Sequence, residues 1–186
     1  MRRLLLVAAA SALLAGAGCD SELTLRDAQT TAAPPATSPE LPSGATLDAA
    51  ETVLRTSDGR RLPVDPQQVT GYIDSAVLNG DYVDISGWAA PADLSRAAAG
   101  VVALVDRRSV ASAVPDGARP DLVEGYDRPG LASAGFAMSI PRSRLRCTER
   151  TGGLQILAAT QRAAGQLEWL DDSDAAVRSA CQEGHD

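Results

Sequence analysis

Residues 71–90 read GYIDSAVLNGDYVDISGWAA, and this stretch decides the fold of the chain. It holds most of two runs with β character, 70–73 and 82–86, with a turn between them. The turn sequence Asn79-Gly80-Asp81 supplies the positive φ angles that a tight hairpin needs. We therefore expect a β-hairpin here, and we expect it to nucleate a β-sandwich.

The second run of this hairpin alternates between two faces. Val83 and Ile85 point to one face, which we expect to be the core, and Asp84 points to the other. Strict alternation places Trp88 on the polar face as well. Because Gly87 precedes it, we expect a β-bulge at Gly87 that turns the indole back into the core.

Short β-prone runs separated by turn residues recur through the rest of the chain. They are 52–56 and 60–64 around an Asp-Gly turn, 100–106, 109–114, 136–140, 154–160 and 165–170. A short helix over 47–55 competes with the first of these runs, and a terminal helix is expected over 174–181. The pattern predicts an all-β fold for residues 47–186, an antiparallel β-sandwich of about seven to nine short strands with a short C-terminal helix.

The N-terminus has the composition of a secretory signal peptide, residues 1–18. Two arginines precede an apolar run, 4–14, which is too short to span a bilayer as a helix. The Ala-Gly-Cys ending at Cys19 resembles the bacterial lipobox, which implies lipidation of Cys19. The alternative is ordinary cleavage after Ala17. Residues 19–46 are rich in Thr, Ala, Pro and Ser and predict a disordered tether.

These features predict an exported protein, held on the cell membrane by its lipid and facing the periplasm or the cell exterior. If Cys19 is acylated, Cys147 and Cys181 remain as a pair in an oxidising compartment. We expect a disulfide between them; the alternative is two free thiols.

Charge excludes one class of partner. The chain has 24 acidic and 17 basic residues and a net charge of −7. A chain this acidic repels nucleic acid, and no basic stripe with interleaved aromatic residues offsets the repulsion. We therefore expect no nucleic-acid partner.

The sequence offers little machinery for catalysis or metal binding. The single histidine, His185, lies beside the C-terminus, so neither a Ser-His triad nor a histidine zinc site is expected. Two alternatives stay open. Asp84 with Asp74 or Asp81 makes a carboxylate pair of the kind that hydrolyses glycans. Asn79, Asp81 and Asp84, or the acids of 171–174, offer oxygen ligands for calcium. We expect no cofactor.

Four residues are candidates for a ligand-binding or structural role: Trp88, Arg119, Asp121 and Asp84. Trp88 is expected in the core. Arg119 and Asp121 can pair and fix the long connection 115–131, or Arg119 can bind an anionic ligand. Asp84 is expected to be a solvated strand residue unless one of the two alternatives above holds.

Several short motifs together resemble the small β-sandwich modules with a G-W-A motif that are appended to bacterial glycosyltransferases and envelope proteins. The motifs are Gly71, Ile73 and Asp74; Gly87-Trp88-Ala89; 101–106; Arg119-Pro120-Asp121; and Gly135-Phe136. The resemblance covers 69–141 and implies an accessory role with no catalytic residue. We therefore expect a non-enzymatic, lipid-anchored envelope protein that binds or scaffolds an unknown envelope protein or glycan. A small carboxylate-dependent hydrolase and a calcium-dependent adhesion-like module are the alternatives.

Overall fold

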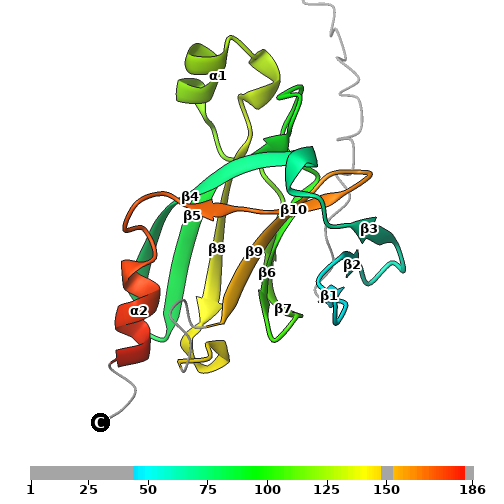
Figure 1. Cartoon of the computed structure of the whole chain (residues 1–186). Coiled ribbons are helices and arrows are strands. Elements are labelled where there is room, and N and C mark those ends of the chain that lie inside the picture. The colour runs from blue at the N-terminus through cyan, green and yellow to red at the C-terminus, as the bar shows by residue number, and fades with distance from the viewer. Residues whose placement is uncertain (1–43, 148–152, 183–186) are drawn as a thin grey trace, which may run out of the picture. The chain divides into compact units, whose positions relative to one another are not determined.

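The computed structural model describes residues 44–147 and 153–182. These residues form eleven strands in two sheets, together with short helices, and the expected all-β sandwich is confirmed (Figure 1). One sheet has the order β10-β9-β6-β7-β1-β2-β3, with bounds Ala164–Gln166, Leu154–Ala159, Gly100–Val105, Arg108–Ala113, Thr46–Leu47, Val53–Arg55 and Arg61–Pro63. The other has the order β11-β4-β5-β8, with bounds Glu168–Trp169, Val69–Asn79, Tyr82–Pro91 and Gly135–Pro141.

The hairpin predicted from residues 71–90 is the pair β4–β5. The strands pair from Val69 opposite Pro91 to Asn79 opposite Tyr82, so only Gly80 and Asp81 form the loop. Gly80 has a φ of 57°, a conformation that glycine adopts without steric cost. The turn predicted from the sequence is therefore confirmed.

The predicted bulge at Gly87 is wrong, although Trp88 is buried as expected. The register shift lies on the facing strand, between Ile73 and Ser75, so Asp74 has no partner on β5. Gly87 keeps the regular alternation, and Trp88 points to the same side as Asp84. Another part of the chain covers the indole there, so the strand does not need to turn it inward.

That cover comes from the connection between β7 and β8. Its helix α1 (Pro120–Tyr126) and its 3-10 helix η2 (Pro129–Leu131) lie at one end of the two sheets (Figure 1). Leu122 of α1, Leu131 of η2 and Ala134 bury Trp88 in a small core of their own. The sequence reading left 115–131 irregular. A helix-start signal was present, since Pro120 occupies the first turn with Asp121 beside it.

Strand β6 is buried on both faces, as its unbroken apolar run predicts. Val101 and Ala103 face the main core between the two sheets. Val102 and Leu104 face a second core, which Leu54 of β2 helps to enclose. That second core lies within one sheet, because the seven-stranded sheet curls round.

The curl nearly closes the seven-stranded sheet. Val64, just after β3, forms a parallel bridge to Ala164 in β10, so the last strand in the sheet order meets the first. The first hairpin, β2–β3, therefore serves as a wall of the second core. The competing helix over 47–55 is not formed: β1 ends at Leu47, β2 takes up 53–55, and the residues between them form a turn.

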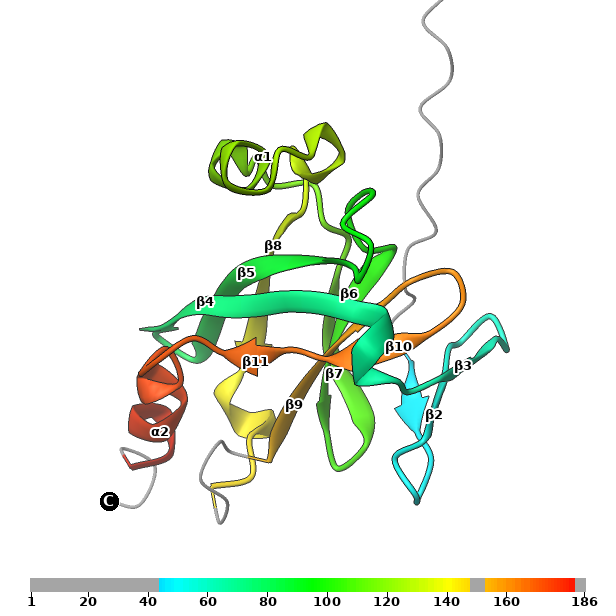
Figure 2. The same cartoon turned by 45° about the horizontal axis from the view of Figure 1, so that its top comes forward.

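The run 165–170 divides between the two sheets instead of forming one strand. Strand β10 pairs antiparallel with β9, whereas β11 lies parallel to β4 in the other sheet (Figure 2). Leu167 lies between the two strands and is buried in the main core, so it anchors the crossing. One pair in the sandwich is therefore parallel, which the sequence reading did not anticipate.

The C-terminal helix and the disulfide agree with expectation. Helix α2 (Ala175–Gln182) buries Val177 against the main core, and Cys147 is joined to Cys181 with their Cα atoms 4.9 Å apart. The hydroxyl of Ser173 donates a hydrogen bond to the carbonyl oxygen of Ile73 at 3.0 Å, which ties the start of α2 to β4. In the ranges 44–147 and 153–182, no helix is both long enough and apolar enough to cross a bilayer.

Candidate functional site

Outward-pointing side chains form rows across β4, β5 and β8, on the face turned away from the seven-stranded sheet, here named the outer face. The rows, from β4 through β5 to β8, are Tyr72, Trp88 and Gly135; Ser75, Ser86 and Ala137; Val77, Asp84 and Ser139; and Asn79, Tyr82 and Pro141. The bulge at Asp74 makes these rows possible. It moves Ser75 to the side of the sheet where Tyr72 already lies.

Three aromatic rings meet at the end of the outer face that α1 covers. Trp88 is only 3% exposed, whereas Tyr72 and Tyr126 are 38% and 46% exposed. The ring centroid of Trp88 lies 6.0 Å from that of Tyr72 and 5.9 Å from that of Tyr126, with tilted planes. A buried indole thus positions two tyrosine rings that solvent can reach.

Arg119 links α1 to the bulge. Its Nη1 donates to Asp74 Oδ2 at 2.6 Å, and its Nε and Nη2 donate to the carboxylate of Asp121 at 3.0 and 2.8 Å. The side chain passes over Gly135, where a Cβ would lie 3.2 Å from Arg119 Cγ. The hydrogen bond with Asp121 raises the pKa of Arg119, and the same bond lowers the pKa of Asp121. Both groups therefore stay charged, and α1 is held in place.

A hollow of about 630 Å³, lined by both polar and apolar side chains, lies beside this cluster on the outer face. Ser75 and Ser86 are hydrogen-bonded across it at 3.2 Å. Asp84 accepts hydrogen bonds from Ser139 Oγ at 2.5 Å and from Asn79 Nδ2 at 2.8 Å. These bonds, the one from Ser139 first, lower the pKa of Asp84 and keep it ionised.

The structure brings the four sequence candidates onto one face. Trp88, Arg119 and Asp121 meet at the α1 end, and Asp84 lies two rows away from Trp88 along β5. Arg119 and Asp121 do pair, as predicted. The candidate lipidation residue Cys19 lies outside the described residues.

The sequence reading missed the three tyrosines and the role of Asp74. Tyr72 alternates with Ile73, which was a signal that its ring faces outward. Tyr82 is 49% exposed at the far end of the outer face. Tyr126 reaches the face only because α1 folds over Trp88, and nothing in the sequence indicated this contact.

The two alternatives that depended on acid clusters gain no geometric support. Asp74 is paired with Arg119, and Asp84 is bonded to Ser139 and Asn79. Within residues 44–147 and 153–182, no group of three or more His, Cys, Asp or Glu side chains is arranged to hold a metal ion.

Comparisons with known protein families, with curated proteins and with solved structures found no match to this chain.

Proposed function

We propose that this chain is a non-enzymatic, lipid-anchored envelope protein whose outer face binds a glycan. One observation carries the proposal. All three tyrosines of the chain and one of its two tryptophans gather on this face, in a chain with only 3% aromatic residues. Between the tyrosines lie hydroxyls, an amide and a carboxylate.

Saccharide chemistry fits both the aromatic rings and the polar groups of this surface. A sugar ring has C–H faces that pack on aromatic rings, and hydroxyls that donate to carboxylates and exchange hydrogen bonds with serines. Tyr72 and Tyr82 mark the two ends of the hollow, so an extended chain of sugars can contact both. Because the protein is acidic, the favoured ligand is uncharged.

The lowered pKa of Asp84 does not suit it to the acid role in glycan hydrolysis. Glycoside hydrolysis needs one carboxyl group that keeps its proton, which means a raised pKa. The pKa of Asp84 is instead lowered by its hydrogen bonds. An ionised Asp84 is suited to accept hydrogen bonds from sugar hydroxyls.

The test is calorimetric titration of the full-length chain with two neutral probes, cellohexaose and chitohexaose. We expect Tyr72→Ala and Tyr126→Ala each to weaken binding about tenfold, as truncation of an aromatic anchor does. Leu170→Ala is the matched control, because Leu170 is also 46% exposed but follows β11.

Three results would overturn the proposal. The first is the absence of binding with both probes, and the second is unchanged affinity in both tyrosine variants. The third is the release of new reducing ends from either probe by the wild-type chain, since that would make the protein a hydrolase. If the chain binds no glycan but captures an envelope protein, and the tyrosine variants lose that capture, the partner of the outer face is a protein.

A further inference from the structure

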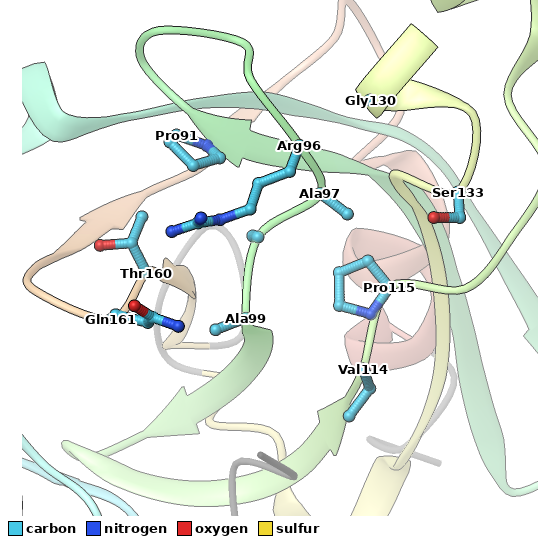
Figure 3. A pocket seen from close by; sticks show the side chains of 11 residues that line it. Pro91, Arg96, Ala97, Ala99, Val114, Pro115, Gly130, Ser133, Thr160 and Gln161 are labelled. Carbon is cyan, nitrogen blue, oxygen red and sulfur yellow. The ribbon is translucent and has the colours of Figure 1, made fainter. Parts of the chain in front are cut away.

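A second pocket lies where β5 leaves the sheet toward β6, and it is separate from the hollow on the outer face. Figure 3 shows the side chains that line this pocket. Its volume is about 290 Å³. It is lined by the end of β5 and the loop after it, the residues just after β7, η2 with the residues after it, and the turn after β9. No carboxylate lines it. Its charged residue is Arg96.

Arg96 stretches across this pocket toward Thr160 and Gln161 (Figure 3). Within the described part of the chain, its guanidinium forms no hydrogen bond or ion pair. The nearby carboxylate of Asp93 attracts the Arg96 guanidinium electrostatically but forms no hydrogen bond with it. That carboxylate accepts instead from the amide and hydroxyl of Ser95, at 3.1 and 2.7 Å. The donors of Arg96 are therefore free for a ligand.

A larger hollow of about 530 Å³ adjoins this pocket. The pocket and this hollow share Pro91, Arg96, Thr160 and Gln161, so Arg96 lines both. The 530 Å³ hollow is also lined by Arg162, whose side chain likewise has no partner among the described residues. Two free guanidiniums against one exposed carboxylate make this end of the sandwich locally basic, in a chain with a net charge of −7.

Hydrogen bonds hold both walls in place. The loop that carries Arg96 is fixed at Leu94, whose amide donates to Pro91 O at 2.9 Å, and at Ala98, whose amide donates to Ala89 O at 2.9 Å. The opposite wall is fixed by Thr160, whose hydroxyl oxygen accepts from the amide of Arg162 at 3.1 Å. The pocket is therefore formed before a ligand arrives, which lowers the entropic cost of binding.

We propose that this pocket binds a small ligand through an oxyanion, a carboxylate or a phosphate, held by Arg96 and assisted by Arg162. A guanidinium presents a planar fork of donors that matches two oxygens of either group. The volume suits a single small molecule rather than a polymer. This site takes an anion, whereas the outer face is proposed to take a neutral chain, so either proposal can fail alone.

The test is an NMR titration of the full-length chain carrying Cys19→Ser, labelled with nitrogen-15, at constant ionic strength. The probes are glucuronate and inorganic phosphate, with glucose and chloride as controls. We expect saturating shifts of the Arg96 side-chain Nε–H signal and of the amides of Ala97, Ala99 and Gln161 with at least one of the two anions. Glucose and chloride should produce none. The anion with the higher affinity identifies the ligand as a carboxylate or a phosphate.

Two variants decide the role of Arg96. Arg96→Gln should weaken binding about tenfold or more, because it removes charge-assisted hydrogen bonds. Arg61→Gln on β3 makes the same change of charge at an exposed site away from the pocket, and should leave affinity unchanged. Absence of saturation with both anions, equal shifts with chloride, or unchanged affinity in Arg96→Gln would each overturn the proposal.

Discussion

At the scale of single residues, Gly87 reports how closely β4, β5 and β8 approach one another. A Cβ on Gly87 would lie 2.2 Å from the carbonyl oxygen of Tyr72 and 2.9 Å from Cζ of Phe136. Because the first of these atoms is backbone, relief requires β4 to move. We expect Gly87→Ala to lower the free energy of unfolding by about 1–3 kcal/mol, as overpacking does, when measured by urea denaturation.

Gly125 provides the matched control for that substitution. It lies within α1, and a Cβ there meets nothing within 4 Å. Gly125→Ala should raise the free energy of unfolding by about 0.5–1 kcal/mol, because alanine has the better helix propensity. Equal stability of Gly87→Ala and the wild type would contradict the packing of these three strands.

The hydrogen bonds of Asp84 lead to a prediction about its pKa. Hydrogen bonds from Ser139 and Asn79 lower its pKa below the ordinary value of 3.8, so its ionised form favours the folded state. This contribution is complete above pH 3.8 and is lost as the pH falls through the lower, folded-state pKa. Ser139→Ala should therefore raise the pKa of Asp84 toward 3.8, which a carbon-13 NMR titration of the side-chain carboxyl groups measures.

Asp93 is the internal control in the same titration. Its pKa is lowered by Ser95, which Ser139→Ala does not touch. The Asp93 titration should therefore be identical in the two proteins. An unchanged pKa of Asp84 in Ser139→Ala would show that the hydrogen bond from Ser139 is not what lowers this pKa.

Residue roles were predictable from the sequence only where they depend on near neighbours. The turn at Gly80 and the inward positions of Val83 and Ile85 follow from local alternation. The burial of Trp88 was predicted for the wrong reason, because its cover comes from Leu122 and Leu131, more than thirty positions away. Alternation assigns a side chain to a face, but it carries no information about what lies on that face.

At the scale of elements, short hairpins were the predictable part. The pairs β2–β3, β4–β5 and β6–β7 each have a short loop with turn residues between two β-prone runs. The division of 165–170 into β10 and β11 was not predictable, because each of its two halves pairs with a different partner strand. The bulge at Asp74 was equally hidden, since a register shift depends on the facing strand.

The disulfide gives the prediction at this scale. Cys147 and Cys181 are 34 positions apart, and removal of the bond frees the unfolded chain. We expect Cys147→Ala with Cys181→Ala to lower the free energy of unfolding by roughly 3–4 kcal/mol in urea denaturation. Helix α2 should remain folded, because Val177 is fully buried and Ser173 still bonds to Ile73.

Hydrogen exchange separates a lost cross-link from a lost helix. Amides of α2 should exchange faster in the double variant because the helix opens locally. The exchange rates of β6 amides should rise only as much as the global loss of stability requires. Wild-type protein treated with a thiol reductant is the control, and it should match the double variant. Unchanged stability after reduction would contradict the expected contribution of the disulfide.

At the scale of the whole molecule, the curl of the seven-stranded sheet explains how a chain with few large aromatic residues fills two cores. Small and branched side chains of β6 pack on both faces of one strand. The unbroken apolar run of 100–106 predicted this double burial. It did not predict that β1–β3 form the second wall, because the contact of Val64 with Ala164 spans a hundred positions.

The proposed membrane anchor depends on Cys19, which lies outside the described residues. Each buried CH₂ of an acyl chain contributes about 0.8 kcal/mol, so two or more chains hold a protein stably on a membrane. We expect Cys19→Ser to move the protein from the membrane fraction to the soluble fraction after export. Cys147→Ser, which removes a cysteine from the folded domain, should stay in the membrane fraction.

Mass spectrometry of the mature N-terminus distinguishes the two cleavage schemes. Lipidation predicts a chain that begins at Cys19 with the mass of attached acyl groups. Ordinary cleavage after Ala17 predicts a chain that begins at Gly18 and carries Cys19 as an unmodified thiol. The second result, or a Cys19→Ser protein that still fractionates with membranes, would rule out the lipid anchor. Glycan binding on the outer face and anion binding at Arg96 do not depend on the anchor, and their tests would be unaffected by that result.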